Sequence, residues 1–426
     1  MNKTVNKFHC IARKAKENPD EQFTSLAHHL TEDYLLSSFR KLRKSAASGI
    51  DKEDGWSYEL DKLVRIRELH ERLRAQKYRA PHIKRVWIDK EDGKRRALGI
   101  STTEDKIVQR AVTDILTPIY EADFYDFSYG YRPKRSAHQA LTYLRTQCMR
   151  HEIKWILDAD IQGCFDNFDH KIMMELLQRR IKDKSILRLI GKWLKVGVVD
   201  GKSFHRTSKG TPQGNIISPL LCNMYLHYVL DSWVDETIRP LMKGDIFMVR
   251  YADDFVIGFE HEEDARRVAQ TLPKRMSKYG LTIHPDKTKL MQFMPAKGGK
   301  RHTLDFLGFT HYWGKTKRGR YTIKRRTSTK KMRKIKHNLG EACQKMRHLK
   351  IKTQHRKLRR KLLGMYQYFG IRGNYIRTAC IQHIAFHLWR KWLNRRSQKK
   401  SYTMSAYKDL LKVFPLPAPR IVHKNV

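Results

Sequence analysis

Two adjacent aspartates, Asp253 and Asp254, interrupt an otherwise apolar stretch, IFMVRYADDFVIGF (246–259). The pattern predicts a strand, a tight turn that contains Ala252 and the two acids, and a second strand. Like charges side by side repel each other, and neither strand needs them for packing. Asp-Asp pairs are also common in plain polar turns. The apolar flanks favour a buried hairpin, where a double charge is costly without a partner.

A third carboxylate at the end of another predicted strand would complete a metal site. KWILDADI (154–161) alternates like a strand and carries Asp158 and Asp160 on one face. Two divalent ions about 3.5–4 Å apart can clamp an attacking 3′-oxygen and a leaving pyrophosphate. Oxygen ligands and triphosphate substrates suit Mg²⁺. The residue types therefore indicate nucleotidyl transfer, with Asp160 or Asp158 as the third acid.

The charge of the chain predicts a polyanionic partner. The formal net charge is +45 and the pI is about 10.1. Residues 311–426 contain 33 Lys and Arg but only two acids, Glu341 and Asp409. Aromatic and basic residues interleave over this whole stretch, whereas a membrane-surface helix would need a clean apolar face. Nucleic acid is therefore the expected partner, and no membrane partner is expected.

Length and composition set the broad class. The 426 residues, 40% of them hydrophobic, are enough for two or three packed domains. No run approaches the ~18 apolar residues of a membrane span, and no apolar run follows the basic start, so a cytoplasmic location is expected. The six cysteines are scattered without a CxxC pair, which disfavours a zinc site or a disulfide framework.

Other segments predict the elements around these acids. HIKRVWIDKEDGKRRALGI (82–100) has the pattern of two strands around the turn Glu91-Asp92-Gly93. Ser101 and Glu104 form a capping-box pattern before an amphipathic helix. From about residue 320 onward the pattern is helical and basic.

Several motifs, in this order along the chain, resemble those of group II intron-type reverse transcriptases. YADD (251–254) resembles the family's YxDD box, and DADIQGCFDNFDH (158–170) resembles its first catalytic box. The other similar segments are SYGYRPKRSAHQAL (128–141), SKGTPQGNIISPLLCNMYLHYVLD (208–231), LTIHPDKTKL (281–290), DFLGF (305–309), GMYQYFGIRGNY (364–375) and FPLPAPRIVH (414–423). The similarity runs from about Leu26 to the end, and the ordered set is far more specific than any single box.

The resemblance implies an α+β right-hand polymerase, with fingers and an antiparallel-sheet palm followed by an all-helical basic thumb. The expected divisions are an N-terminal extension with the start of the fingers (1–80), fingers and palm (81–310), a helical thumb or maturase domain (311–384) and a short basic tail (385–426). The tail would be at most a rudimentary DNA-binding region. Nothing in it matches the paired cysteines and His-Asn-His motif of the endonuclease that many relatives carry.

For catalysis, the resemblance assigns the three carboxylates to Asp160, Asp253 and Asp254. It favours Asp160 over Asp158 because of the spacing to the aromatic Phe165. The implied ligands of two Mg²⁺ ions, for which Mn²⁺ is a substitute, are Asp160, Ile161, Asp253 and Asp254.

The resemblance also assigns cations to the triphosphate. Lys90 and Arg96 match the two that hold it, and the neighbouring Lys94 and Arg95 are alternatives. Cations there would stabilise charge that develops on the pyrophosphate. Lys287, in HPDKTK, matches a lysine that protonates the leaving pyrophosphate, and a helix-capping or surface lysine is the alternative.

Two further positions match residues that contact the incoming nucleotide. Phe165 matches an aromatic that excludes a ribose 2′-hydroxyl and so favours dNTPs, and a core phenylalanine is the alternative. Gln213, in TPQG, matches a residue that supports the nucleotide and the template base. Asn215 stands where the family usually has a second glycine, and Ala97 and Ser101 replace its usual prolines. Asn tolerates a positive φ better than most residues, so we expect the turn to survive.

Basic residues are expected to contact RNA in two regions. Three of them, Arg132, Lys134 and Arg135 in YRPKRS, match contacts to template phosphates. The second region is the thumb, with Arg325, Arg326, Lys330, Lys331, Arg333, Lys334, Arg356, Arg359 and Arg360. Six interleaved aromatics either stack on unpaired bases or belong to the core: Tyr366, Tyr368, Phe369, Tyr375, Trp389 and Trp392. Phe306-Leu307-Gly308-Phe309 resembles a primer-grip hairpin, with core packing as the alternative.

The implied function is RNA-directed DNA synthesis, together with binding of structured intron RNA that assists splicing and mobility. The implied partners are an RNA template, a DNA or RNA primer, dNTPs, the intron RNA and a target DNA. Two alternatives remain open at this point. One is a related polymerase recruited by its host for phage defence or DNA repair, and the other is a non-catalytic RNA-binding splicing factor.

Overall fold

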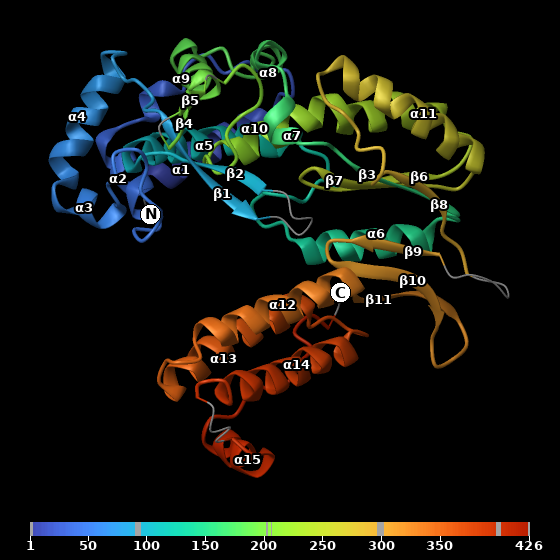
Figure 1. Ribbon diagram of the computed structural model, residues 1–426. Coiled ribbons are helices and arrows are strands. Elements are labelled where there is room, and N and C mark those ends of the chain that lie inside the picture. Colours follow the sequence, from blue (N-terminus) through green and yellow to red (C-terminus); the bar gives the residue numbers. More distant parts are fainter. Residues whose placement is uncertain are drawn as a thin grey trace. The chain divides into compact units, whose positions relative to one another are not determined.

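The computed structural model describes residues 3–89, 95–201, 203–205, 207–295, 302–397 and 402–424 (Figure 1). The chain forms two compact units. The first contains residues 1–136 and 157–290, and the second contains 137–156 and 291–426. Two of these boundaries fall inside strands β3 (Trp155–Asp160) and β8 (Lys289–Gln292). The divisions expected from the sequence, at 80, 310 and 384, stay predictions.

The first unit begins with helices packed around one buried helix, α5 (Thr103–Asp123). Its face with Ile107, Ala111 and Ile115 is fully buried, as an apolar stripe at helical spacing predicts. The expected N-cap at Ser101 is wrong by one residue: the Thr102 hydroxyl accepts from the Asp105 amide at 3.3 Å. The helices that precede α5 are α1 (Lys3–Glu17), α2 (Glu32–Arg40), α3 (Gly55–Leu60) and α4 (Lys62–Arg74).

The predicted hairpin within 82–100 is confirmed as β1 (Ile83–Asp89) paired antiparallel with β2 (Arg95–Ile100). Its turn, residues 90–94, lies outside the described residues. Strand β1 also pairs in parallel with β4 (Val198–Asp200), and β4 pairs with β5 (Ser203–His205). The sheet order is therefore β2-β1-β4-β5.

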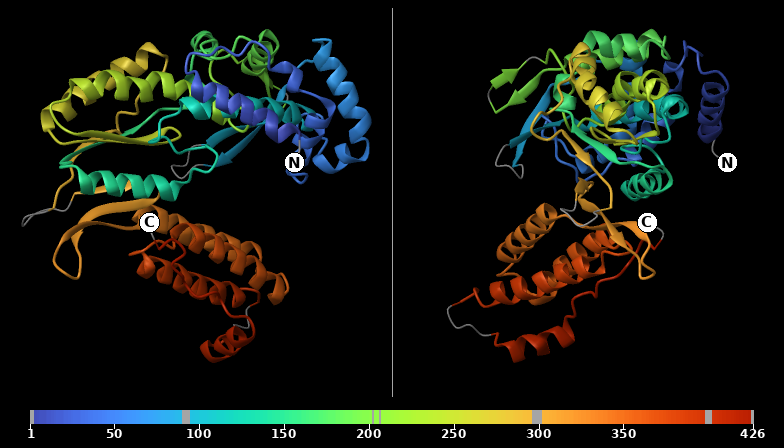
Figure 2. Two further views of the ribbon diagram at one scale, coloured as in Figure 1. Left: turned by 180° about the vertical axis from the view of Figure 1, so that it is seen from behind. Right: turned by 90° about the vertical axis from the view of Figure 1, so that its right-hand side faces the viewer.

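A second sheet, of order β6-β7-β3-β8, carries the acids. Strands β6 (Ile246–Tyr251) and β7 (Asp254–Phe259) pair antiparallel over their full length, which confirms the predicted strand–turn–strand. Both are almost wholly buried, and α11 (Glu262–Lys278) packs on β7, as the left view of Figure 2 shows. The other helical segments of this unit are α7 (Cys164–Asn167), α8 (His170–Leu177), α9 (Lys184–Lys195), α10 (Ser218–Leu226), η2 (His227–Asp231), η3 (Trp233–Ile238) and η4 (Arg239–Leu241).

The second unit combines a three-stranded sheet with long helices. Its sheet has the order β11-β10-β9, with β9 (Thr303–Phe306), β10 (Phe309–Lys315) and β11 (Tyr321–Thr327). The helical pattern expected from about residue 320 is therefore wrong up to Thr327. Burial alternates along β11, and its many Lys and Arg hide that period of two in the sequence. The helices are α6 (Ala137–Arg150), α12 (Thr329–Lys345), α13 (Ile351–Phe369), α14 (Tyr375–Leu393) and α15 (Met404–Val413).

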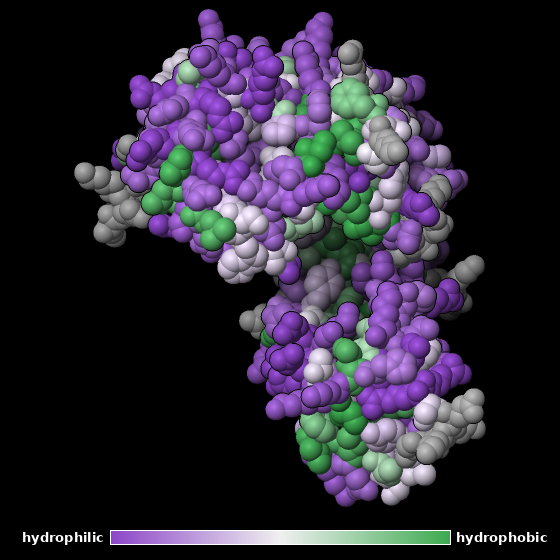
Figure 3. All heavy atoms as spheres, turned by 60° about the vertical axis from the view of Figure 1, so that its left-hand side comes forward, coloured by the Kyte–Doolittle hydropathy of each residue, from purple (hydrophilic) through white to green (hydrophobic). Residues whose placement is uncertain are grey.

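The surface drawn in Figure 3 is mostly hydrophilic, with small apolar patches on each unit. None of the helices in the described ranges combines the length and the apolar character that a membrane crossing requires.

Candidate metal and nucleotide site

Strand β3 ends at Asp160, and the segment that leads to β8 fixes this end. The His284 amide donates to the Asp160 carbonyl at 2.8 Å, and Ile161 forms an antiparallel bridge with Ile283. Lys287 follows in the same segment. Its Nζ donates to Asp160 Oδ2 at 2.7 Å, so the predicted lysine does reach the predicted acid. Ile161 itself is buried, and its assignment as a metal ligand stays a prediction.

The tight turn between β6 and β7 presents Asp253 and Asp254. Tyr251 faces Asp254 across the hairpin, and Ala252 between them has a φ of 59°. Residues other than glycine rarely adopt this left-handed backbone conformation, so the turn needs support from its surroundings. The chain at Gly130 gives that support. A Cβ on Gly130 would lie 2.3 Å from the Ala252 nitrogen, so only glycine allows the two backbones to approach this closely.

A buried ion pair holds the same turn from the protein interior. Arg250 and Asp231 are both fully buried, and the guanidinium grips the carboxylate through Nε at 2.7 Å and Nη2 at 2.5 Å. Its Nη1 donates to the Ala252 carbonyl and to Asn223 Oδ1, each at 3.0 Å. Asn223 in turn donates to the Gly130 carbonyl at 2.6 Å. Burial alone would lower the pKa of Arg250, but Asp231 raises it above its ordinary value.

Sequence reasoning missed this network. A signal for it exists, because Arg250 is a charged residue inside an apolar strand pattern, and such a residue needs a buried partner. The partner cannot be located from the sequence, since Asp231 and Asn223 are 19 and 27 residues away and belong to helical segments.

The three predicted carboxylates lie close enough to perturb one another. Burial raises the pKa of Asp254 to about 7, and the negative charges of Asp253 and Asp160 act in the same direction. Loss of surrounding water is the largest cause, although part of the Asp254 residue stays exposed. Burial and the charge of Asp160 also raise the pKa of Asp253, while Arg96 and Lys287 lower it. Asp160 is thus the β3 acid whose charge acts on both partners.

These acids fit a divalent cation by their chemistry. The Asp160 carboxylate lies close enough to Asp254 to add to the rise in the pKa of Asp254. A divalent cation would relieve the same repulsion with oxygen ligands alone. Within the described ranges, no group of three or more His, Cys, Asp or Glu side chains has the spacing of a formed metal site. The arrangement is therefore a set of converging acids rather than a closed cage.

Phe165 is half-buried and does not belong to the core. It lies on the short helix α7, five residues after Asp160, and its ring meets the edge of the Tyr131 ring at 6.5 Å between centroids. Tyr131 is itself exposed. The alternative of a core phenylalanine is thus not supported, and contact of Phe165 with a nucleotide stays a prediction.

The TPQG segment packs tightly against this helix. The Thr211 amide donates to the Phe165 carbonyl at 2.6 Å, and a Cβ on Gly210 would lie 2.4 Å from the same oxygen. Gln213 Nε2 donates to Asp166 Oδ2 at 3.1 Å. The structure thus brings Gln213 to the helix that carries Phe165.

Ser101 and Asn215, two of the residues that depart from the family pattern, contact each other. Ser101 Oγ donates to Asn215 Oδ1 at 2.7 Å in a buried position. Gln109 joins them, because its Nε2 lies 3.3 Å from Ser101 Oγ and its Oε1 accepts from the Ile216 amide at 2.8 Å. Asn215 does not need a positive φ, since Gly214 takes that conformation with a φ of 115°.

Of the cations assigned to the triphosphate, the structure describes the two arginines but not the two lysines. Arg96 is exposed on β2, and its charge lowers the pKa of Asp253, so it lies within electrostatic reach of the acids. Arg95 pairs with Asp89 at 3.6 Å. Lys90 and its alternative Lys94 lie outside the described residues.

One predicted template contact is wrong. Arg132 is buried, and its guanidinium pairs with Glu121 at 3.0 Å and donates to the carbonyls of Tyr125 and Ser128. It therefore ties the 121–132 loop together and has no surface to offer a phosphate. Its neighbour Lys134 is exposed, and Arg135 pairs with an exposed aspartate.

The cations of the second unit that were predicted to contact RNA also divide into one that is buried and others that are exposed or half-buried. Arg325 is buried and donates to the Leu141 carbonyl at 3.3 Å, and burial lowers its pKa to about 10. A phosphate contact by Arg325 is therefore not supported. The others are exposed or half-buried on β11, α12 and α13: Arg326, Lys330, Lys331, Arg333, Lys334, Arg356, Arg359 and Arg360.

The aromatics of this unit also split between core and surface. Tyr366, Phe369 and Trp389 are core residues, whereas Tyr375 is 53% exposed. Tyr368 and Trp392 are half-buried. Phe306 and Phe309 are both buried and flank a two-residue turn in which Leu307 and Gly308 have positive φ. The two phenylalanines of the predicted primer grip therefore pack into the core, and contact of this hairpin with a primer stays a prediction.

With this geometry established, comparison with known proteins gives the family. Residues 88–311 match the family model described as reverse transcriptase (RNA-dependent DNA polymerase), which is more than half of the chain. The chain therefore belongs to the reverse transcriptase family, whose domain implies the right-hand polymerase fold.

Among known proteins, the chain is similar to the group II intron-encoded protein LtrA of Lactococcus lactis. The two are 38% identical over 241 residues, or 55% of this chain and 39% of LtrA. The chain thus spans well under half the length of that relative. Protein YkfC of Escherichia coli is 31% identical over 279 residues, or 58% of this chain and 73% of YkfC. Nuclear intron maturase 1, mitochondrial, of Arabidopsis thaliana is 32% identical over 92 residues, or 22% and 13%.

We expect Asp231→Ala to destabilise the first unit strongly. The change leaves the Arg250 charge buried without its partner, which typically costs about 3–5 kcal/mol of unfolding free energy. Denaturant unfolding measures it. Arg266→Ala is the control, because it removes an exposed pair with Glu262 and should cost less than about 1 kcal/mol. Equal effects of the two changes would show that the buried pair does not hold the fold.

Ser101→Ala and Asn215→Ala should act on one shared interaction. Each single change leaves a buried polar group unpaired, at about 1–3 kcal/mol. The double variant should then lose less than the sum, with a coupling of about 0.5–3 kcal/mol. Unfolding free energies of the wild type, both single variants and the double variant give this number. Strict additivity would mean that the hydrogen bond contributes nothing.

The raised pKa of Asp254 predicts a pH-dependent stability without metal. The folded protein keeps a proton up to about pH 7, whereas the unfolded chain loses it near 3.8. Wild-type stability therefore falls as pH rises through this window. Asp254→Asn removes the effect, so in a chelating buffer it should stabilise the protein more at pH 8 than at pH 5. Thermal unfolding measures this, with the exposed Glu175→Gln as control. A stabilisation independent of pH would contradict the assignment.

Proposed function

We propose that this protein is an RNA-directed DNA polymerase of group II intron type. The observation that carries the proposal is the convergence of Asp160, Asp253 and Asp254, whose charges raise the pKa of Asp253 and Asp254. Family membership supports it, because residues 88–311 match the reverse transcriptase model. In this proposal residues 81–310 form the fingers and palm, and residues 311–384 form the thumb.

Asp160, Asp253 and Asp254, with the Ile161 backbone beside them, would hold two Mg²⁺ ions, or Mn²⁺ in their place. Bound there, the ions supply positive charge to the attacking 3′-oxygen and to the leaving pyrophosphate. The ion pair of Arg250 with Asp231 keeps the turn rigid, so that the two carboxylates need not reorganise during the reaction. Lys287, which contacts Asp160, would donate a proton to the pyrophosphate.

Nucleotide selection would fall to the surface next to the acids. The half-buried ring of Phe165 would exclude a 2′-hydroxyl and so favour dNTPs. Gln213, on the segment that hydrogen-bonds to α7, would support the nucleotide opposite the template base. Arg96, together with Lys90, would hold the triphosphate.

The second unit would bind structured RNA. Its exposed cations on α12 and α13 include Lys330, Arg333, Arg356, Arg359 and Arg360. Such a surface attracts phosphates without reading sequence. The similarity to LtrA, named as a group II intron-encoded protein, supports intron RNA as the ligand, and splicing would be assisted by binding its active shape. An RNA template, a DNA or RNA primer and a target DNA complete the proposed partners.

Primer extension on an RNA template with Mg²⁺ tests the proposal. We expect DNA synthesis from dNTPs, little synthesis from NTPs, and a loss of more than about a hundredfold in rate for Asp253→Asn, because a lost metal contact removes several kcal/mol of transition-state stabilisation. The exposed Glu175→Gln is the control, and unfolding curves show that each variant is folded. A folded wild-type protein that binds RNA but extends no primer would refute the polymerase and leave a splicing factor.

A further inference from the structure

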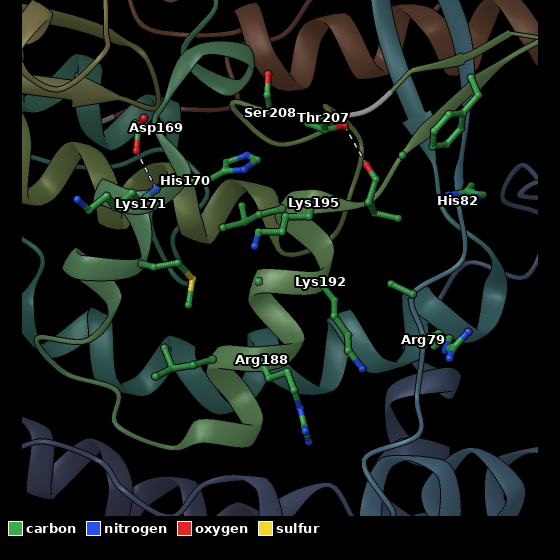
Figure 4. A pocket seen from close by; sticks show the side chains of 18 residues that line it. Arg79, His82, Asp169, His170, Lys171, Arg188, Lys192, Lys195, Thr207 and Ser208 are labelled. Atoms are coloured by element: carbon green, nitrogen blue, oxygen red, sulfur yellow. Dashed lines mark hydrogen bonds between the residues drawn. The ribbon is translucent and has the colours of Figure 1, made fainter.

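A cavity of about 1190 Å³ in the first unit lies outside the site described above (Figure 4). Its walls come from α8, α9, the segment that leads into β1 and the segment that follows β5. None of the three aspartates lines it, and neither do Phe165 and Gln213. No function is assigned to its residues by the motifs or by the acids.

The cavity is strongly basic. Arg188, Lys192 and Lys195 project from one helix, and Arg79 and Lys171 come from the segments on either side (Figure 4). Burial and the charges of Arg188 and Arg79 lower the pKa of Lys192, which shows that these cations are crowded. Among the described residues that line the cavity, the one carboxylate is Asp169. It is occupied in accepting from the backbone amides that begin α8. Lys192 itself donates to the Tyr78 carbonyl. An anion in the cavity would relieve the repulsion among its cations.

One wall offers an aromatic face. Phe204 is 51% exposed, and its ring meets the His82 ring at 4.9 Å between centroids. The ring lies over Gly197, where a Cβ would come within 2.2 Å of it. Apolar side chains of Leu194 and Val196 continue the surface inward. The cavity thus combines an exposed aromatic ring with several cations in its lining.

We propose that this cavity binds a single-stranded segment of nucleic acid, with a base stacked on Phe204 and the flanking phosphates against Arg188 and Lys195. Aromatic faces accept any base, and a basic groove follows the backbone. A duplex is a poorer fit, because its bases are stacked on one another and present no free face. The inference rests on the proposed function only in taking nucleic acid as the partner.

The cavity shares a wall with the segment that carries TPQG. His170, in the cavity wall, hydrogen-bonds to the Gly210 carbonyl at 2.7 Å, and the backbones of Asp169 and Lys209 form an antiparallel β-bridge. Thr207 donates to the Val196 carbonyl at 2.8 Å. A strand held in the cavity would therefore stay next to the nucleotide site without entering it. An unpaired end of the template and a separate unpaired RNA or DNA segment share this chemistry.

Fluorescence anisotropy with labelled (U)12, and with its DNA counterpart, tests the proposal in full-length protein that carries Asp253→Asn. Phe204→Ala should weaken binding about 5- to 100-fold, the range for one lost base stack. Arg188→Ala/Lys195→Ala should weaken it as well and reduce the salt dependence by about one to two phosphate contacts. Lys182→Ala/Lys184→Ala is the charge-matched control, because both lysines are exposed and neither lines the cavity.

Cross-linking by ultraviolet light gives the local readout, because other basic surfaces also bind RNA. The oligonucleotide should attach to the peptide that contains Phe204, and a competing duplex should not displace it. Templates with and without an unpaired 5′ end distinguish the two sources of the strand. Binding by Phe204→Ala that equals wild type, a charge effect that equals the control, or displacement by a duplex or a phosphopeptide would overturn the inference.

The outcome is separable from that of the proposed function. In protein that keeps Asp253, Phe204→Ala should extend a primer on a blunt-ended template at a rate within about twofold of wild type. The reason is that none of the metal-site residues lines the cavity. A protein that extends no primer, yet still cross-links to the oligonucleotide at the peptide that contains Phe204, would refute only the proposed polymerase activity.

Discussion

The buried pair of Arg250 and Asp231 is the interaction on which the site depends. Two neighbouring aspartates on a left-handed turn are unfavourable in conformation and in charge, so they stay in place only if the surroundings fix the turn. The Arg250 guanidinium does this with one planar group, which binds Asp231, Asn223 and the Ala252 carbonyl together. A lysine could not replace it, because a single ammonium has no fork that spans all three acceptors. Its backbone adds a fourth link, since Tyr129 donates to the Arg250 carbonyl.

Nearby cations make such an acidic cluster tolerable. The net charge of +45 draws nucleic acid to the protein. Near the acids this balance is specific, because Arg96 and Lys287 lower the pKa of Asp253 while Asp160 raises it. The same excess of cations is a liability where they crowd without acids, as Arg188 and Lys192 do on α9. Crowded cations near an open cavity are thus a more informative sign of a ligand than net charge alone.

Local patterns predicted the elements but not their partners. The β6–β7 hairpin and the β1–β2 hairpin follow from alternation and turn residues, which are properties of neighbouring positions. Arg132 and Arg325 looked like phosphate ligands because a buried and an exposed arginine are identical in sequence. Only the fold shows that Glu121 and backbone carbonyls already occupy Arg132. The contact between Ser101 and Asn215 is likewise invisible, since 114 residues separate two positions that each looked like an isolated departure.

Close contacts between backbones hold the segment that carries Phe165 against the segment that carries Gln213. Gly210 lies so near the Phe165 carbonyl that no side chain fits between them, and the Thr211 amide donates to that carbonyl. On the other side, Gly99 donates to the Gln213 carbonyl at 2.6 Å, and Gly214 lies against the Gly99 oxygen. Because these contacts are between main-chain atoms, they fix the backbone at Phe165 relative to the backbone at Gln213. A steric filter for the ribose works only if its wall is fixed relative to the base pair. In the proposed function these glycines would supply that rigidity, and the ring of Phe165 would supply the wall.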